Sequence, residues 1–215
     1  VVKYGGNAML NDQITNKVLQ DIVFLQCAGM RPAVVHGGGP EITAMLMQAG
    51  KKSEFVSGLR VTDAESVGIA EMALVGKINT DLVARLNTLG GRAVGLNGKD
   101  ANLVQAKKHL ADVYENGEVN LVDIGYVGNV EHVNTDLIEV LLANGFIPVI
   151  APTGVGSSGE TYNINADSVA GEIAGALKAE KLLVLTDVRG IYSDYRDENS
   201  FISTLTFEKA QELII

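Results

Sequence analysis

Tryptophan is absent from the 215 residues, while proline and cysteine are scarce, with four and one. The single cysteine, Cys27, excludes an internal disulfide, and its place in an apolar helical stretch favours a buried, unreactive thiol. No run of about 18 apolar residues is present, so the sequence predicts no membrane-spanning helix. Lysine and arginine number 17 against 26 acidic residues and form no block, which disfavours binding to nucleic-acid phosphates.

Glycine, by contrast, is abundant, with 24 of 215 residues where about 7% is usual. This excess predicts tight turns and close approaches of the backbone. Hydrophobic residues make up 47% and charged residues 20%, as is typical of soluble globular proteins. The length fits one large α/β domain or two small ones. Because no linker separates two parts, we predict a single domain over residues 1–215.

Short apolar runs alternate with helical patterns along the chain. The runs that we interpret as buried strands are Val1–Val2, Ala33–Val35, Ala93–Leu96, Phe146–Ile150 and Leu182–Leu185. The alternation predicts an α/β fold, an αβα sandwich with a mostly parallel central sheet. A capping box from Thr62 to Glu65 is expected to open one helix. The alternating pattern from Ala101 to Val133 predicts an antiparallel β-hairpin excursion.

The segment HGGGP, from His36 to Pro40, joins one of these strands to a helix, since Pro40 suits the first helical position. Glycine N–H groups at a helix N-terminus can cradle a phosphate or a carboxylate, because no Cβ obstructs the ligand. A tight turn with positive φ explains the glycines equally well. We interpret His36 as a structural or neutral hydrogen-bonding residue.

Lys3 lies inside the first apolar strand, two residues before Gly5 and Gly6. A buried lysine is costly unless it is paired or functional. We therefore expect its ammonium group to meet a phosphate near these glycines. The alternative is an edge strand from which the lysine reaches solvent.

The segment NINAD places two amides and a carboxylate before and within the start of a helix. Asn163 and Asn165 alternate in an extended stretch and point to the same side, and Asp167 falls in the first helical turn, where the dipole favours a carboxylate. An anion beside two phosphate-binding turns is unfavourable unless it holds a lysine, so we predict that Asp167 organises one. A simple helix cap explains Asn165 but not Asn163.

Two further segments carry candidate binding residues. Arg60 of GLRVTD offers the planar, bidentate donor that suits a substrate carboxylate, although an isolated arginine is by default a solvated surface residue. The loop TDVRGIYSD, from Thr186 to Asp194, follows a predicted strand. Asp187 and Gly190 fit either an ordinary turn or a loop that wraps a nucleotide.

Six motifs occur in this order along the chain: KYGG, VVHGGGPEI, GLRVTD, VGKIN, NINAD and LTDVRGI. With them the whole chain resembles the amino acid kinase family, and within it the N-acetylglutamate kinases. The resemblance implies ATP-dependent phosphorylation of the γ-carboxylate of N-acetyl-L-glutamate in arginine biosynthesis, with Mg²⁺ carried on ATP and no protein ligand to the metal. It also implies the αβα sandwich and a homodimer or higher homo-oligomer.

The resemblance also assigns roles to residues by position. Lys3 would stabilise the transferring phosphoryl group, and Asp167 would orient Lys3. The residues that would bind acetylglutamate are Gly38, Gly39, Arg60 and Asn163. The residues that would approach the phosphates and the nucleotide are Gly5, Gly6, Thr186, Asp187, Val188, Gly190 and Ile191. No nucleic acid or membrane is expected as a partner. The resemblance leaves open a PII-type signalling protein as a regulatory partner, although no sequence feature marks a surface for it. The expected location is the cytoplasm or, if an upstream transit peptide was removed, a plastid.

Two alternatives stay open: a kinase of the same superfamily for another small acid or carbamate, or a module that binds acetylglutamate without catalysis. The family continues beyond QELI into a glycine-rich loop with a second phosphate-binding lysine, which these 215 residues do not contain. We therefore expect them to hold the acetylglutamate half of the site and part of the ATP half, and to bind acetylglutamate with little kinase activity. The sequence does not decide whether arginine inhibits the protein.

Overall fold

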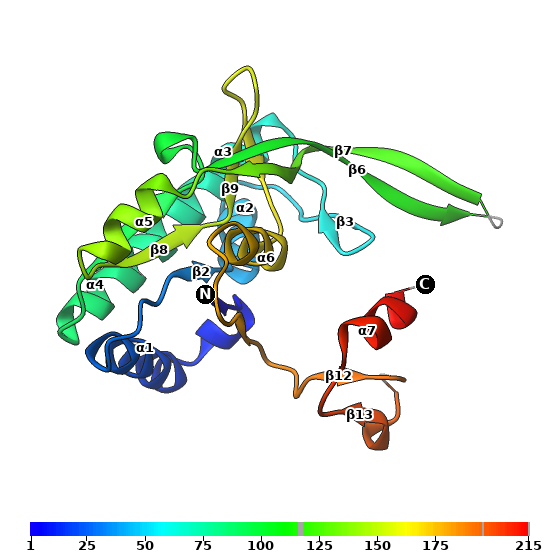
Figure 1. Ribbon diagram of the computed structural model, residues 1–215. Coiled ribbons are helices and arrows are strands. Elements are labelled where there is room, and N and C mark those ends of the chain that lie inside the picture. The colour runs from blue at the N-terminus through cyan, green and yellow to red at the C-terminus, as the bar shows by residue number, and fades with distance from the viewer. Residues whose placement is uncertain (116–117, 195, 215) are drawn as a thin grey trace. The chain divides into compact units, whose positions relative to one another are not determined.

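The computed structural model describes residues 1–115, 118–194 and 196–214 (Figure 1). It contains two compact units, Val1–Leu185 and Thr186–Ile215, which are described separately below. The last apolar residue of QELII, Ile215, lies outside the described residues. The prediction of a single domain over residues 1–215 stays a prediction.

Five strands form the central sheet of the first unit, and each coincides with a predicted strand (Figure 1). Their order across the sheet is β11 (Leu183–Leu185), β1 (Val2–Tyr4), β2 (Val34–His36), β8 (Ile147–Ala151) and β5 (Ala93–Asn97). All four pairings are parallel. In β1, Lys3 lies opposite Val35 on one side and Val184 on the other. The edge-strand alternative for Lys3 is therefore wrong.

Helices cover both faces of this sheet. One face carries α1 (Asp12–Cys27) and α4 (Thr80–Thr88), and the other carries α5 (Asp136–Ala143) and α6 (Ala166–Ala176). Val2 and Tyr4 pack on the side of α1 and α4, whereas Val35 packs on the side of α5 and α6. Successive strand residues point to opposite faces, so Lys3 points towards the α6 side. The predicted αβα sandwich is confirmed.

The start of α3 (Ala64–Glu71) differs from the predicted capping box. The cap is Asp63, whose side chain accepts a 2.7 Å hydrogen bond from the N–H of Ser66. Thr62 is fully buried and donates instead to the carbonyl of Arg60, while Glu65 pairs with Lys51. The box prediction is wrong because tertiary contacts engage both side chains that it needs.

A second sheet closes into a small barrel. Its strands are, in order, β10 (Thr161–Asn163), β7 (Glu118–Val133), β6 (Val104–Glu115) and β9 (Thr153–Val155). Strands β6 and β7 form the predicted hairpin excursion, which extends away from the helices in Figure 1. Its tip, residues 116–117, lies outside the described residues. Because β10 pairs with both β7 and β9, the NINAD segment enters α6 directly from this sheet.

The second unit is small. It comprises β12 (Ile191–Tyr192) paired antiparallel with β13 (Phe201–Ile202), the short η4 (Glu198–Ser200) and α7 (Phe207–Ile214). Tyr192 and Phe201 pack edge to face, with their ring centroids 5.6 Å apart.

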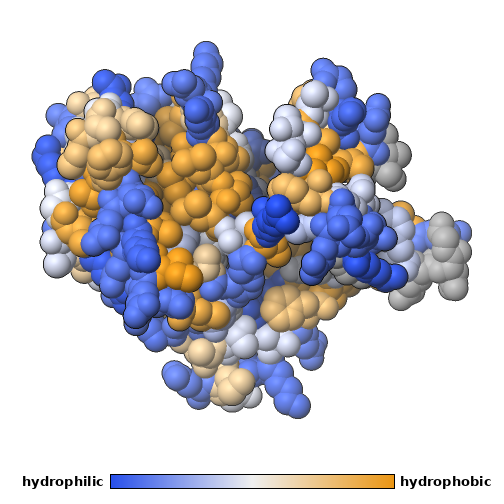
Figure 2. Space-filling view, turned by 90° about the horizontal axis from the view of Figure 1, so that it is seen from below, coloured by the Kyte–Doolittle hydropathy of each residue, from blue (hydrophilic) through white to orange (hydrophobic). Residues whose placement is uncertain are grey.

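Several large apolar side chains of the first unit are exposed, and Figure 2 shows apolar surface on the side seen from below. Leu183 and Val184 are 45% and 49% exposed although they belong to the central sheet.

Cys27 is exposed, so the prediction of a buried thiol is wrong. It is the last residue of α1 and lies outside the buried stripe that includes Ile22 and Val23. Within the described ranges, no helix is both long and apolar enough to cross a membrane.

Candidate active site

Two glycine turns meet at the carboxyl ends of β1 and β2. A Cβ added to Gly37 would lie 2.8 Å from the nitrogen of Gly6, and one added to Gly6 would lie 3.0 Å from the nitrogen of Gly38. These distances are too short for a real side chain, so the turns require glycine because their backbones touch. After them, η1 (Asn7–Leu10) follows β1, and α2 (Gly39–Gln48) follows β2 with Pro40 in its first turn.

The N–H groups of these turns fall into two kinds. Gly5 donates to the carbonyl of Leu185 at 2.9 Å, and Gly37 donates to the carbonyl of Tyr4 at 2.8 Å, so both hold strands of the sheet together. In the part of the chain that the structure describes, the N–H groups of Gly6, Gly38 and Gly39 have no acceptor. Free N–H groups at a helix start are suited to an anion.

Lys3 and Asp167 form an ion pair from two different elements. The Nζ of Lys3 lies 3.0 Å from a carboxylate oxygen of Asp167. The lysine side chain is 10% exposed, whereas the aspartate side chain is 59% exposed. Asn165 caps α6 by accepting from the N–H of Asp167 at 2.7 Å, which fixes the start of the helix beside β1. The structure thus brings together the lysine and the acid that the sequence analysis paired.

Arg60 is buried, with 7% exposed. It ends the hairpin of β3 (Phe55–Val56) and β4 (Leu59–Arg60) and lies with its guanidinium carbon 4.7 Å from the centre of the Phe55 ring. Its Nη2 donates to the carbonyl of Gly39 at 3.1 Å and to the hydroxyl of Thr43 at 2.9 Å, and its Nη1 donates to the hydroxyl of Ser53. The interpretation of Arg60 as a solvated surface residue is therefore wrong.

No carboxylate pairs with Arg60 among the described residues, and all its acceptors are uncharged. By contrast, several cations in the described ranges form salt bridges, among them Lys3, Lys51, Lys77, Arg85, Lys99 and Lys108. Burial lowers the pKa of the Arg60 guanidinium from its usual value, yet a guanidinium stays charged at any physiological pH. A buried cation without a counter-ion is costly, and a bound anion would remove that cost.

His36 holds the second glycine turn in place through hydrogen bonds. It is fully buried, its Nδ1 donates to the carbonyl of Gly37 at 2.9 Å, and its Nε2 accepts from the amide of Asn79 at 3.1 Å. Burial lowers the pKa of His36 to about 4, so the ring is neutral at pH 7. Asn79, the last residue of the π-helix η2 (Met72–Asn79), also donates to the carbonyl of Val149 at 2.8 Å. The predicted neutral, hydrogen-bonding role of His36 is confirmed.

Asn163 ends β10, where it lies opposite Thr153 of β9 and Val127 of β7. Its side chain is partly exposed and makes no hydrogen bond with the residues that the structure describes. Asn163 stands four residues before Asp167, which places it within roughly 14 Å of the Lys3 ion pair. Its amide is available to a ligand, but no contact joins it to Arg60.

The loop from Thr186 to Ile191 belongs to the second unit. Thr186 donates to the carboxylate of Asp187 at 3.2 Å, and Val188 is exposed. Gly190 has a φ of +155°, and a Cβ there would lie 2.8 Å from the ring of Phe201. The glycine is thus required by the packing of this unit. The approach of these residues to a nucleotide stays a prediction.

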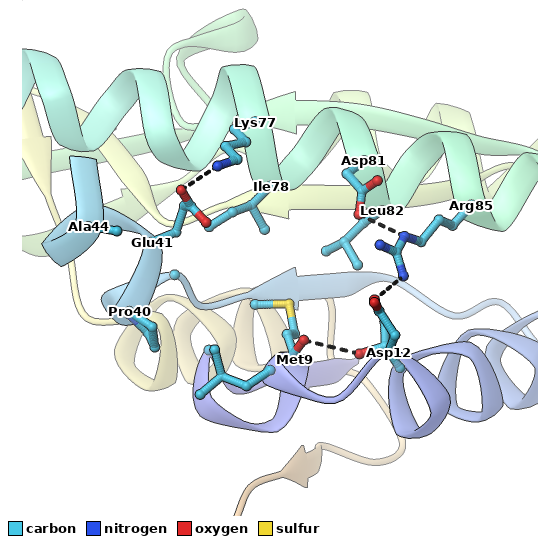
Figure 3. Close-up of a pocket in the computed structure, with 14 residues that line it drawn as sticks. Met9, Asp12, Pro40, Glu41, Ala44, Lys77, Ile78, Asp81, Leu82 and Arg85 are labelled. Atoms are coloured by element: carbon cyan, nitrogen blue, oxygen red, sulfur yellow. Dashed lines mark hydrogen bonds and ion pairs between the residues drawn. The ribbon is translucent and has the colours of Figure 1, made fainter. Parts of the chain in front are cut away.

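A cavity of about 530 Å³ borders the same turns through Gly6 and Gly38 (Figure 3). Its walls carry the ion pairs Lys77–Glu41 at 2.6 Å and Arg85–Asp12 at 2.9 Å. The cavity has the volume of a small-molecule site, but Lys3, Arg60, Asn163 and Asp167 do not line it. We place the chemistry at the buried cations and the free N–H groups, because they are the groups that can bind a phosphate or a carboxylate.

Sequence reasoning missed three polar residues that support the site. Thr43 and Ser53 hold Arg60, and Asn79 holds His36. Thr43 lies four residues after Gly39, which puts its hydroxyl one helical turn from that carbonyl, so its spacing offered a signal. Ser53 and Asn79 act across long sequence separations, and no local pattern marks them.

No group of three or more His, Cys, Asp or Glu side chains that could hold a metal ion occurs in the described ranges. The site consists of two buried cations, three free backbone N–H groups and one partly exposed amide. Such a set can bind a molecule with several negative charges and can stabilise charge that develops between them.

Comparisons with known proteins identify the family of the chain. The acetylglutamate kinase of Moorella thermoacetica is 55% identical over 214 residues, which are 100% of this chain and 72% of that protein. Among solved structures, smu.665 from Streptococcus mutans UA159 is 29% identical with a TM-score of 0.78, covering 99% of this chain and 80% of that one. N-acetylglutamate synthase from Neisseria gonorrhoeae, complexed with coenzyme A and N-acetyl-glutamate, is 26% identical with a TM-score of 0.79, over 99% of this chain and 46% of that one. Residues 1–214 match the Amino acid kinase family, and with the fold described above this shows that the chain belongs to the amino acid kinase family.

Proposed function

We propose that the protein is an acetylglutamate kinase, which transfers the γ-phosphoryl group of ATP to the γ-carboxylate of N-acetyl-L-glutamate. The observation that carries the proposal is Arg60, a buried cation whose acceptors are all neutral. The identity of 55% to the Moorella acetylglutamate kinase supports the choice of substrate. Arg60 would hold the α-carboxylate, while Asn163 would bind the acetamido end.

The chemistry follows from the charges of the site. Phosphoryl transfer requires positioning and electrostatic stabilisation more than covalent help from the protein. Lys3 would stabilise the negative charge of the transferring group, and Asp167 holds the Lys3 ammonium at 3.0 Å so that it need not reorganise. The free N–H groups of Gly6, Gly38 and Gly39 would donate to the phosphoryl oxygens and the substrate. The attacking carboxylate is ionised at neutral pH, so no general base is needed.

We propose that Mg²⁺ arrives on the phosphates of ATP. Mg²⁺ commonly keeps several waters and binds through substrate phosphates with few protein ligands. Lys3 and the glycine N–H groups are donors to phosphate oxygens and not ligands of a metal, so the set of groups at this end of the sheet suits the phosphates themselves.

The test is calorimetric titration of N-acetyl-L-glutamate into the 215-residue chain, together with an assay of ADP release with ATP present. We expect saturable binding of acetylglutamate, and weak binding of unacetylated glutamate and of carbamate. Equal binding of those two acids would favour a kinase for another small acid. Binding with almost no ADP release is expected, because the second phosphate-binding lysine of the family is not among these residues. Full kinase activity would show that this lysine is dispensable or is replaced within the chain. Absence of acetylglutamate binding would contradict the proposal.

We also propose a homodimer or higher homo-oligomer. The support is the number of large apolar side chains that stay exposed in the first unit, among them Met47, Phe55 and Met72, which are each more than half exposed. Light scattering at several concentrations measures the oligomeric state, and a monomer at all of them would contradict it. A cytoplasmic or plastid location and a PII-type partner stay predictions.

A further inference from the structure

The three acceptors of Arg60 are all neutral and come from two elements. Gly39 and Thr43 belong to α2, and Ser53 lies in the segment between α2 and β3. The ring of Phe55 stacks beneath the guanidinium. The ring on one face and the hydrogen bonds along the edge fix the plane of this side chain. Both terminal nitrogens already donate to the protein, so the group is held in position before any substrate arrives.

Thr43 is suited to this task by its place on α2. Its hydroxyl donates its one hydrogen to the carbonyl of Gly39 at 3.0 Å. A hydroxyl has one donor, so the oxygen of Thr43 can only accept towards Arg60, as it does at 2.9 Å. The helix therefore fixes the direction of the hydroxyl, and the hydroxyl in turn fixes the guanidinium.

The acids nearest to Arg60 in sequence are engaged elsewhere. Asp63 and Glu65 both pair with Lys51, at 2.6 and 3.1 Å. The hydrogen bond from the Lys51 ammonium is the main cause that holds the pKa of Asp63 well below its usual value. Lys51 thus keeps two carboxylates occupied in the segment that follows Arg60, and the charge of Arg60 stays uncompensated.

We propose that Thr43 and Ser53 are positioning residues for substrate recognition, because their hydroxyls orient Arg60 without neutralising it. This inference rests on the proposed function, in which Arg60 receives the α-carboxylate of acetylglutamate. A carboxylate at position 43 or 53 would orient Arg60 equally well but would supply the counter-ion and repel the substrate. Neutral acceptors keep the orientation of the Arg60 guanidinium and also its attraction for the substrate carboxylate.

Three substitutions at one position test the idea. Thr43→Val removes the hydroxyl at nearly the same volume, Thr43→Ser keeps it, and Thr43→Asp introduces a charge. In calorimetric titrations we expect Thr43→Val to raise the Kd for acetylglutamate about tenfold, since a hydrogen bond to a charged group is lost. Thr43→Ser is expected within twofold of wild type, and Thr43→Asp is expected to weaken binding most.

Thr88→Val is the matched control. Thr88 also donates to the carbonyl four residues earlier, that of Ala84 at 2.9 Å, but it lies on α4 away from Arg60. It is expected to bind acetylglutamate as the wild type does. The NMR signal of the Arg60 Nε–H, recorded without ligand, adds a readout that a merely structural role would not move. We expect it to be sharp in wild type and Thr43→Ser, and broadened in Thr43→Val.

The outcomes separate the two proposals. If wild type binds acetylglutamate but Thr43→Val binds it equally well, the positioning inference fails and the proposed function stands. Tighter binding by Thr43→Asp than by Thr43→Val also overturns the inference. If wild type does not bind acetylglutamate, the proposed function is contradicted, and so is the positioning inference, which depends on it. Melting temperatures of all variants show whether any loss reflects unfolding.

Discussion

Lys3 and Arg60, the two buried lysine and arginine side chains in the described part of the chain, are stabilised in opposite ways. Lys3 lies in the central sheet and has a carboxylate partner, Asp167, at 3.0 Å. Arg60 lies on a two-stranded hairpin and has hydroxyls, a carbonyl and an aromatic ring around it. A paired cation suits a role in which charge develops briefly, whereas an uncompensated cation suits a permanent anion. The difference predicts that Lys3 affects turnover and Arg60 affects substrate affinity.

The largest expected effect is on Lys3. In the full-length enzyme, Lys3→Met removes the ammonium that would stabilise the transferring phosphoryl group, and we expect kcat to fall by about 10²–10³, as for loss of an oxyanion donor. The KM for acetylglutamate is expected to change little. Folding is expected to persist, because the Asp167 partner is 59% exposed and can be solvated. Steady-state kinetics and circular dichroism measure both, and a kcat within twofold of wild type would remove Lys3 from the mechanism.

His36 holds the glycine turn through its hydrogen bond to Gly37, and its burial predicts a pH dependence of stability. Its pKa is about 4 in the folded chain against 6.5 in the unfolded chain, so the unfolded state binds more protons between those values. Stability is therefore expected to fall as the pH falls from 6.5 to 4, by roughly 3 kcal/mol from this group. Urea unfolding across this range measures it. The same slope in a His36→Gln variant would show that other groups cause the loss.

Arg60→Lys is expected to raise the KM for acetylglutamate about 30-fold and the KM for ATP less than threefold. The lysine keeps the charge but loses the planar guanidinium that Gly39, Thr43 and Ser53 hold in position, and a charge-assisted hydrogen bond contributes about 1.5–3 kcal/mol. Arg92→Lys is the matched control, because Arg92 also lies over an aromatic ring, at 4.1 Å from the centre of Phe146, and donates to a carbonyl. Equal rises in both KM values would show that Arg60 does not bind acetylglutamate selectively.

The smallest expected effect is that of Asp167→Asn. The substitution keeps the shape and leaves the helix cap at Asn165 intact, but it removes the charge that holds Lys3. We expect kcat to fall about tenfold, less than for Lys3→Met, because the ammonium stays in the site but is less well oriented. A fall as large as that of Lys3→Met would mean that Asp167 acts on the substrate itself.

Much of the fold was predictable because the burial pattern is local. All five predicted strands occur in one parallel sheet, and the hairpin excursion occurs where alternation replaced continuous apolar runs. The errors concern side chains whose surroundings come from distant segments. Thr62 is drawn away from the predicted cap by burial, and Cys27 falls outside the buried stripe of α1.

The candidate site was likewise predictable only in part. Local sequence indicated Lys3, the glycine turns and Asp167, because a lysine inside an apolar strand next to glycines, and an acid beside two candidate phosphate turns, call for a function. The binding role of Arg60 came only from the resemblance to the amino acid kinase family. Only the tertiary structure decided which glycine N–H groups are free. Those of Gly5 and Gly37 donate to carbonyls of neighbouring strands, whereas those of Gly6, Gly38 and Gly39 have no acceptor among the described residues. It also decided that the hydroxyls of Thr43 and Ser53 accept hydrogen bonds from Arg60 and leave its charge uncompensated. Segments far apart in the chain supply the hydrogen-bond partners and counter-ions. The sequence gives the residue types, but only the folded chain determines which of them come into contact.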